Sequence, residues 1–398
     1  MGDRPEGPGK HHGISRRDFL RTSTLVVGGA AAEACRSSPV DPGPSDLPEP
    51  PEVVDPTARV HAVTGSDLAS MTHRVLDDLG GVGTVVHEGE SVFVKPNMVT
   101  LPWAPRGEVF STGECTKPEI VVAVAEACLQ AGAREVTIGD GSHAVELPWE
   151  SATTLDGSTN LAAEAARLGA EYDRPVRLAS LEADSPEWPE VPSDTHLGPI
   201  SVSGLVAGAD RVISVPVAKT HSWAQLTLSL KNFVGIAPLW RYGDLPNGIA
   251  DRGVVFDHGS PAAIASIYLA IVRGVAPDLA IIDFSVGVEG NGPTLSHGGR
   301  TVDMRSRLGS YLLLASADLV AADTIAAWIM SHDPADVVQL EMARAMGLGE
   351  ARPERIEVVG GSLRDLRVAW DAAQLRNLAP PTQGVCPRRS CTWRPMVG

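Results

Sequence analysis

Short apolar runs and longer amphipathic segments alternate along most of this chain. The short runs are rich in β-branched residues and end in polar residues, which is the pattern of buried strands. The longer segments carry apolar residues at helical spacing, and Pro118 and Gly132 mark the start and the stop of the clearest one. The predicted strands are residues 91–95, 135–140, 211–216, 278–283, 311–315 and 355–360, and the predicted helices are residues 118–131, 160–172, 261–273, 319–330 and 335–346. This order predicts an α/β fold in which a largely parallel sheet is flanked by helices.

Composition divides the chain into four parts. They are a predicted signal peptide at 1–34, a Pro-rich acidic linker at 35–56, the α/β domain at 57–370 and a C-terminal tail at 371–398. Within the domain, residues 145–158 and 236–260 are rich in Gly, Pro and Trp and are predicted to be long loops. Loops of this length in a compact domain often carry function.

Polar residues directly follow four of the predicted strands. In open α/β sheets, ligands bind beyond the carboxyl ends of the strands, so these residues are the first candidates for a site. The four places are residues 95–97, 140–143, 219–221 with 231–232, and 283 with the Gly-rich segment 287–293. Each has an ordinary structural alternative, such as a lysine at a strand end or a tight turn. Four of them at equivalent strand ends favour a common site.

Lysines and an imidazole near these strand ends predict an anion site. Lys219, His221 and Lys231 lie within thirteen positions of one another, and Lys95 ends an earlier strand. Ammonium groups bind phosphate and carboxylate, so either is the expected ligand, held by Lys95, Lys219 and Lys231. The residues expected to bind the ligand or a cofactor are Lys95, Asn97, Lys231 and Asn232. His221 is the expected general acid and base.

Two carboxylates are candidates for a metal site. Asp283 and Glu289 could bind a divalent cation or orient His221, which makes His221, Lys219 and Glu289 the expected catalytic set. The alternative is that either carboxylate forms a structural ion pair with a lysine. The glycines of 287–293 would let the backbone approach a ligand. This segment matches neither the P-loop nor the dinucleotide-binding pattern, so it predicts no nucleotide.

Charge and cysteine content exclude several classes of function. The formal net charge is −16, which argues against a general surface for nucleic acid or anionic membrane. The five cysteines include no C-x-x-C, so neither a ferredoxin-type iron–sulfur motif nor a zinc ribbon is present. Cys386 and Cys391 could form a small disulfide in an oxidising compartment. No internal apolar run reaches transmembrane length.

The N-terminal segment predicts export. Residues 15–21, Ser-Arg-Arg-Asp-Phe-Leu-Arg, fit the twin-arginine signal, and a weakly apolar run follows at 22–34. Cleavage after Ala34 would leave Cys35 first, so the alternatives are a lipid-anchored Cys35 and ordinary cleavage beside a free thiol. The expected partner is the twin-arginine translocation machinery, and the expected location is the periplasm or the cell surface. Membrane contact is expected only if Cys35 carries lipid.

Several of these blocks together resemble a bacterial and archaeal family, the domain of unknown function 362. The matching blocks are residues 94–97, 116–118, 131–140, 215–221, 230–235, His258, 283–293 and 317–323. The resemblance implies an α/β domain whose charged residues surround one site, and it supplies no reaction. Some members carry ferredoxin-type cysteine clusters, which this chain lacks. The architecture is also distantly similar to the N-terminal domain of lactate racemase, a nickel-pincer enzyme, and a shared fold does not imply a shared function.

Together these features predict an exported enzyme that acts on a small anionic substrate, with a divalent metal as its candidate cofactor. The first alternative is a non-catalytic metal-binding or anion-binding lipoprotein. The second is a redox protein whose cofactor is loaded before export.

Overall fold

The computed structural model describes residues 49–103, 108–243, 252–253 and 255–375. The signal peptide, Cys35, most of the linker and the Cys386–Cys391 pair lie outside these residues and stay predictions.

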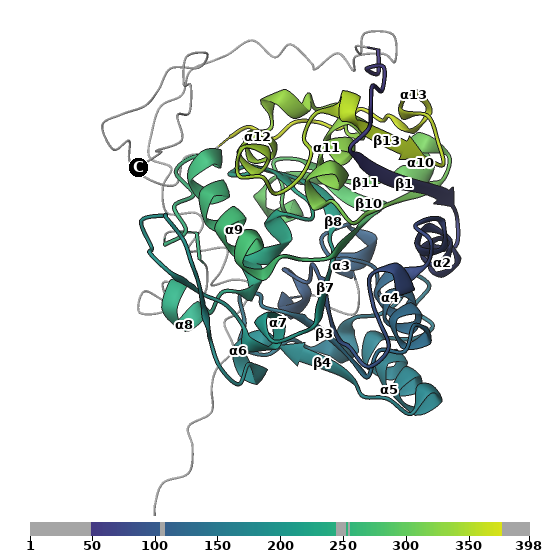
Figure 1. The fold of residues 1–398 in the computed structure, drawn as a ribbon, viewed down its shortest axis with the longest axis vertical. Coiled ribbons are helices and arrows are strands. Elements are labelled where there is room, and N and C mark those ends of the chain that lie inside the picture. Colours follow the sequence, from purple (N-terminus) through teal and green to yellow (C-terminus); the bar gives the residue numbers. More distant parts are fainter. Residues whose placement is uncertain (1–48, 104–107, 244–251, 254, 376–398) are drawn as a thin grey trace, which may run out of the picture.

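One large mixed sheet organises the described chain (Figure 1). Its strands run in the order β13 (Ile356–Val359), β1 (Ala58–Gly65), β12 (Tyr311–Ser316), β10 (Leu279–Gly290), β7 (Arg211–Val215), β2 (Ser91–Pro96), β3 (Glu135–Asp140) and β4 (Val176–Ser180). Three further strands attach to it: β8 (Val217–His221) pairs with β10 and with β9 (Gln225–Thr227), and β11 (Gly299–Asp303) pairs with β10. A separate two-stranded sheet joins β5 (Glu190–Val191) and β6 (Ile200–Ser201).

The sheet is mostly parallel, as predicted. The pairs β4–β3, β3–β2, β2–β7, β7–β10, β8–β10 and β1–β13 are parallel, and β12 is antiparallel to both β1 and β10. The carboxyl ends of β2, β3 and β7 therefore meet at one edge, and β8 continues from β7 beyond that edge. This confirms the predicted fold class.

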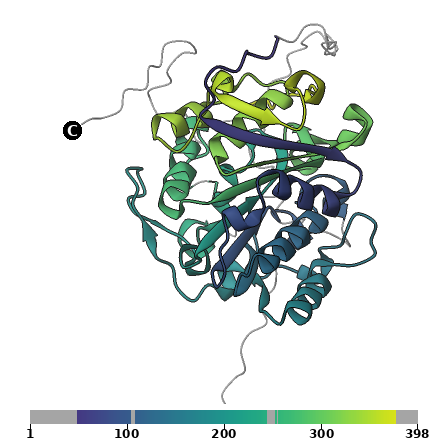
Figure 2. The same ribbon diagram turned by 45° about the vertical axis from the view of Figure 1, so that its right-hand side comes forward.

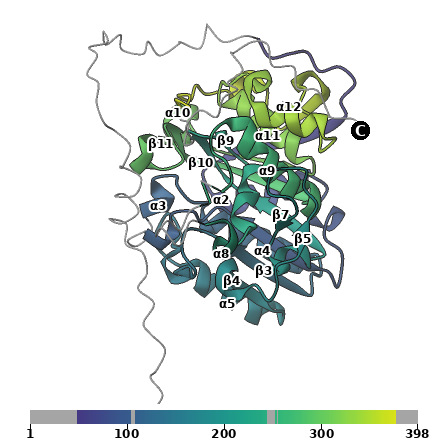
Figure 3. The same cartoon turned by 90° about the vertical axis from the view of Figure 1, so that its left-hand side faces the viewer.

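Helices cover both faces of the sheet. The helices α2 (Leu68–Asp78), α4 (Pro118–Gln130) and α5 (Leu161–Tyr172) pack on one face (Figure 2), and α9 (Pro261–Val275), α11 (Leu319–Ile329) and α12 (Val338–Ala345) pack on the other (Figure 3). Short helices lie in the connections: α3 (Glu108–Ser111), α6 (Leu181–Asp184), α7 (Gly204–Ala207), α8 (Leu239–Tyr242), α10 (Met304–Leu308) and α13 (Leu363–Leu366). No helix in the described ranges is long and apolar enough to cross a membrane.

Local sequence signals fix the starts of the main helices. The side chains of Asp67, Asn160, Ser260 and Asp318 accept hydrogen bonds from backbone N–H groups in the first turns of α2, α5, α9 and α11. Proline in the first turn of α4 and α9 needs no hydrogen-bond donor there and has a helical φ already.

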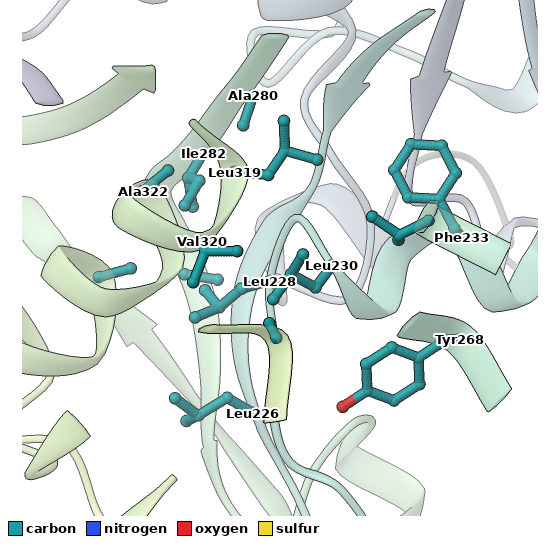
Figure 4. Packing of buried hydrophobic residues seen from close by; sticks show 14 of the residues in the cluster. Leu226, Leu228, Leu230, Phe233, Tyr268, Ala280, Ile282, Leu319, Val320 and Ala322 are labelled. Carbon is teal, nitrogen blue, oxygen red and sulfur yellow. The ribbon is translucent and has the colours of Figure 1, made fainter. Parts of the chain in front are cut away.

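Two apolar layers, one on each face of the sheet, form the core. Strand β12 is buried along its whole length, and its side chains alternate between the layers, so Leu312 and Leu314 face α11 while Leu313 faces α2 and α4. Figure 4 shows part of the α11 side, where Leu228, Leu230 and Val320 belong to one buried apolar cluster. The segment between β9 and residue 236 is therefore tied to the core by its leucines.

The main differences from the predicted elements lie around β8 and β10. Residues 219–221 belong to β8, a strand of its own, and do not form a loop after β7. Strand β10 runs for twelve residues, so the segment expected as a Gly-rich loop begins inside a strand. The sequence pattern also missed β1, β4, β9, β11 and helix α2.

Candidate functional site

A buried ion pair lies where β2 and β3 end. The Lys95 Nζ atom lies 2.5 Å from Asp140 Oδ1, and Nζ also donates to the carbonyl of Pro96 at 2.8 Å. The other oxygen of Asp140 accepts from the Met98 N–H at 2.6 Å. Both side chains of the pair are at most 3% exposed. The register of the parallel strands brings these residues together, since each is at the end of its own strand.

Two asparagines extend this pair into a network. Asn232 Oδ1 accepts from Asn97 Nδ2 at 3.3 Å and lies 3.4 Å from Lys95 Nζ. Asn232 Nδ2 donates to the Lys95 carbonyl at 2.8 Å and to Ser214 Oγ at 3.1 Å. The predicted ligand-binding residues Lys95, Asn97 and Asn232 are thus in direct contact. Asn232 is buried, and its amide links β2 to β7 through the bonds to Lys95 and Ser214, whereas Asn97 is half-buried.

A pair of glycines permits the close packing of this network. A Cβ atom on Gly141 would lie 2.1 Å from the Gly235 carbonyl oxygen, and one on Gly235 would lie 2.6 Å from Asp140 Oδ1. Only glycine at both positions lets the turn after β3 lie against the segment that carries Lys231 and Asn232.

Lys219 differs from the other buried lysines in its partners. Its Nζ donates to Asn97 Oδ1 at 2.9 Å and to the Glu114 carbonyl at 2.7 Å, and the side chain is fully buried. Among the described residues, no carboxylate oxygen lies within 4.0 Å of it. Burial is the main cause that lowers the pKa of this ammonium group to about 8. Lys219 is therefore a buried cation with neutral acceptors only.

His221 follows Lys219 on the same face of β8, because side chains two apart on a strand point the same way. Its Nδ1 accepts the backbone N–H of Trp223 at 3.1 Å, which leaves the proton of the neutral ring on Nε2. Burial, with the charges of Lys231 and His258 next, lowers the pKa of His221 well below its ordinary value of 6.5. The ring is therefore neutral at pH 7 and presents an N–H donor at Nε2.

Two rings lie beside His221, those of Trp223 and His258, the latter 6.4 Å away between centroids. The Trp223 ring lies 5.6 Å from the His221 ring, 6.2 Å from His258 and 5.3 Å from His297, measured between centroids. The Trp223 Nε1 atom is buried, and no acceptor among the described residues lies within hydrogen-bond distance of it. A buried indole N–H without an acceptor is costly unless a ligand or water supplies one.

Two further cations border the network. Arg252 is buried, donates to the carbonyl of Ala237 at 2.7 Å, and its charge is one of the causes that lower the pKa of Lys95. Lys231 is half-buried, and its charge contributes to the lowered pKa of His221. The structure therefore brings together Lys95, Lys219, Lys231, Asn97, Asn232 and His221, all of them predicted site residues.

The prediction for Asp283 and Glu289 needs a correction. The two carboxylates are six residues apart on one strand, which places them on the order of 20 Å apart at ~3.3 Å per residue. Asp283 faces the buried Lys117 ammonium at 3.3 Å, and Glu289 forms a bidentate pair with Arg307 at 2.7 and 2.9 Å. They are too far apart to share one ion, so a divalent metal does not fit this pair. Among the described residues, no group of three metal-ligating side chains converges.

Val288 of β10 pairs with Lys219 of β8, so the next residue, Glu289, points to the opposite face of the sheet from Lys219 and His221 and towards Arg307. The alternative of a structural ion pair with a lysine describes Asp283, which pairs with Lys117, whereas Glu289 pairs with an arginine, Arg307. The expectation for Gly287 needs revision too. A Cβ there would lie 2.3 Å from the Ala218 carbonyl oxygen and 2.6 Å from the Trp370 ring, so this glycine serves packing inside the sheet.

Sequence reasoning missed Lys117 and Trp223 as residues of this region, although a simple signal marks one of them. The chain contains five lysines against 28 arginines. Four of the lysines, Lys95, Lys117, Lys219 and Lys231, lie at this end of the sheet, and the fifth, Lys10, is outside the described residues. Because lysine is rare in this chain, its concentration at one end of the sheet marks positions that favour a compact ammonium group.

Comparison with known proteins finds a relative that matches most of this chain and solved structures of low similarity. A thylakoid-associated protein of Synechocystis sp. is 30% identical over 298 residues, which covers 73% of this chain and 78% of the relative. The lactate racemase apoprotein of Thermoanaerobacterium thermosaccharolyticum aligns with a TM-score of 0.35 at 11% identity, over 69% of this chain and 58% of that one. A protein of Thermotoga maritima of known crystal structure gives a TM-score of 0.36 at 12% identity, over 65% and 57%. The chain thus spans less than two thirds of each of these two solved structures.

The family predicted from the motif blocks is confirmed. The family described as "Domain of unknown function (DUF362)" matches residues 92–328, more than half of the chain. This range runs from β2 to α11 and includes Lys95, Lys117, Lys219 and Lys231. The chain therefore belongs to the DUF362 family.

Proposed function

We propose that this chain binds a small carboxylate or phosphate anion at the site formed by the ends of β2, β3 and β8. The observation that carries the proposal is the Lys219 ammonium, which is fully buried with two neutral acceptors and no carboxylate within reach among the described residues. A buried charge left without an ion-pair partner costs folding free energy, on the order of 3–5 kcal/mol. The more distant charges of Glu114 and Asp140 offset part of this cost for Lys219, but burial outweighs them. An anionic ligand supplies the missing countercharge.

Two neutral donors complete the proposed anion site. The Nε2–H of His221 and the Nε1–H of Trp223 belong to adjoining rings that follow Lys219 on the same hairpin. Asn97 is half-buried, and its Oδ1 accepts a hydrogen bond from Lys219 Nζ. An anion that enters the site would replace this amide oxygen as the acceptor. A cation with two oriented N–H donors in a buried setting holds an oxyanion well, because the low dielectric strengthens each contact.

The second candidate function is catalysis on the bound anion. It is favoured by the pKa of Lys219, about 8, because an amine that titrates near neutral pH can give and take a proton efficiently. His221 would then act as a neutral hydrogen-bond donor to the substrate oxygen, since its Nδ1 is already occupied as an acceptor. In this candidate mechanism His221 only donates a hydrogen bond, instead of acting as the general acid and base that the sequence predicted. Lys219 would transfer the proton.

Calorimetric titration with sodium phosphate and with sodium acetate tests the proposal. We expect wild-type protein to bind one of these anions at pH 7 and Lys219→Met to lose at least about tenfold in affinity, because a hydrogen bond to a charged group is worth about 1.5–3 kcal/mol. Arg59→Met is the matched control, since it removes one exposed positive charge from β1. Equal affinities in wild type and Lys219→Met would contradict the proposal.

Export by the twin-arginine route is a separate proposal that rests on residues 15–21. The Synechocystis relative is described as thylakoid-associated, a description that names a membrane and no export route. We expect Arg16→Lys combined with Arg17→Lys to retain the protein in the cytoplasmic fraction. Unchanged fractionation of this double variant would contradict export by that route.

A further inference from the structure

A cavity of about 170 Å³ adjoins the lysine site. It lies between the residues that follow β2, the turn after β3 and the short helical turn Leu295–His297. Much of its wall is apolar, with Val99, Val109 and Leu295 as members. A cavity of about 150 Å³ lined by apolar side chains is large enough to hold one benzene molecule. The volume therefore suits an apolar group of up to about one six-membered ring.

Rings line two sides of the cavity. The Trp103 and His143 rings lie 5.4 Å apart, and both border the cavity, as does His297. Such rings pack favourably against a planar or aromatic group, in offset or edge-to-face arrangements. The lining of the cavity thus combines apolar and aromatic side chains, as is usual for a pocket that binds a small molecule.

The cavity connects with the anion site through two of its own residues. Glu114 borders the cavity, and its main-chain carbonyl accepts the Lys219 ammonium. Its carboxylate is turned to the backbone N–H of Leu295, at 2.8 Å. On the other side, His297 packs against Trp223, the ring next to His221. A ligand with its charge near Lys219 would therefore have room for an apolar group in the cavity.

We infer that the ligand of this site is an organic anion, a carboxylate or phosphate attached to a compact apolar or aromatic group of about one ring in size. The inference rests on the proposed anion site and adds the cavity as the subsite for the apolar group. Inorganic phosphate and acetate fill only the charged part and bind as fragments of this ligand.

Calorimetric titration with matched pairs of anions tests the inference, with acetate against benzoate and phosphate against phenyl phosphate. We expect the ring-bearing member of at least one pair to bind at least about tenfold more tightly, because it buries additional apolar surface. Leu295→Trp, at a position 36% exposed, adds bulk to the cavity wall without disturbing the core. This variant is expected to lose the advantage of the ring and to keep the affinity for acetate or phosphate within about twofold. Val145→Trp, at a position 56% exposed and outside the cavity lining, is the control and is expected to change neither.

The outcomes separate the two proposals. If acetate or phosphate binds through Lys219 and the ring adds nothing, or if Leu295→Trp leaves the advantage of the ring intact, the cavity inference fails and the anion site stands. If neither member of any pair binds, both proposals fail. Circular dichroism of Leu295→Trp, expected to match the wild type, shows that a loss of ring binding does not come from unfolding.

Discussion

Lys117 and Lys219 are both fully buried at the same end of the sheet, and they differ in their partners. The Lys117 ammonium has a carboxylate, that of Asp283, at 3.3 Å, and it also donates to the Val286 carbonyl. The Lys219 ammonium has two neutral oxygens. A buried charge with its countercharge beside it holds segments together, whereas a buried charge without one raises the free energy of the folded state. From this difference we infer that Lys117 has a structural role, in an ion pair, and that Lys219 binds the ligand.

The largest expected effect is on stability, through the paired lysine. Asp283→Asn keeps the shape of the side chain and removes the negative charge beside Lys117. We expect the free energy of unfolding to fall by about 3–5 kcal/mol, because the ammonium is left buried without a countercharge. Urea unfolding followed by circular dichroism measures this change.

A double variant separates the lost charge from the lost shape. Asp283→Asn combined with Lys117→Met removes both charges, so it is expected to recover most of the stability that Asp283→Asn loses. If the double variant is as unstable as Asp283→Asn alone, the ion pair is not what stabilises this region. Lys219→Met, by contrast, removes a buried charge that has no ion-pair partner within 4.0 Å among the described residues, and it is expected to unfold at no lower urea concentration than the wild type.

Asp323 on α11 is a buried acidic group without an ion-pair partner in the described chain, as Lys219 is a buried basic one. Its substitution is expected to cost less stability than Asp283→Asn. Asp323 is fully buried without a cationic partner among the described residues, and its oxygens accept from Ser229 N and Oγ at 2.8 and 2.5 Å and from Leu230 N at 3.1 Å. These bonds fix the segment that leads into Lys231 and Asn232. Asp323→Asn replaces one acceptor by a donor and is expected to cost about 1–3 kcal/mol.

The pH dependence of stability identifies the role of Asp323. Burial is the main cause that raises its pKa from 3.8 to about 7. Between these values the folded state holds the proton more tightly than the unfolded state, so the group's contribution to stability is lost as pH rises through about 7. The urea midpoint of unfolding is therefore expected to decrease from pH 5 to pH 8, and to decrease by more in the wild type than in Asp323→Asn. Parallel pH profiles would contradict this account.

Hydropathy predicted most of the fold because the core has two layers. Strands buried on both faces form continuous apolar runs, and helices that cover one face show helical spacing with clear caps at Asn160 and Asp318. The exceptions are the N-terminal strand β1 with helix α2, several shorter strands, and the part of β10 beyond Asp283. Strand β8 begins directly after Pro216, which by itself indicates the end of a strand, and a hairpin through Trp223 then forms β9.

The site could be predicted only in part, because spacing shows which residues lie at strand ends and not which residues pair. Lys95, Asn97, Lys219 and Asn232 were found from that position, and the structure joins them by hydrogen bonds. The pairing of Lys117 with Asp283 links residues 166 positions apart, and no local pattern signals it. Glu289 was misassigned because its cation, Arg307, lies beyond a turn and the short strand β11.

The central claim is that Lys219 is a buried cation that an anionic ligand completes, and its pKa with and without anion tests this most directly. Because the chain holds only five lysines, lysine labelled with ¹³C gives five sets of NMR signals, and Lys219→Met identifies the relevant one. We predict a pKa near 8 in the free protein and a rise of at least about one unit when a bound anion stabilises the ammonium form. A pKa above 10 without anion, or one that saturating phosphate, acetate, benzoate and phenyl phosphate all leave unchanged, would contradict the account.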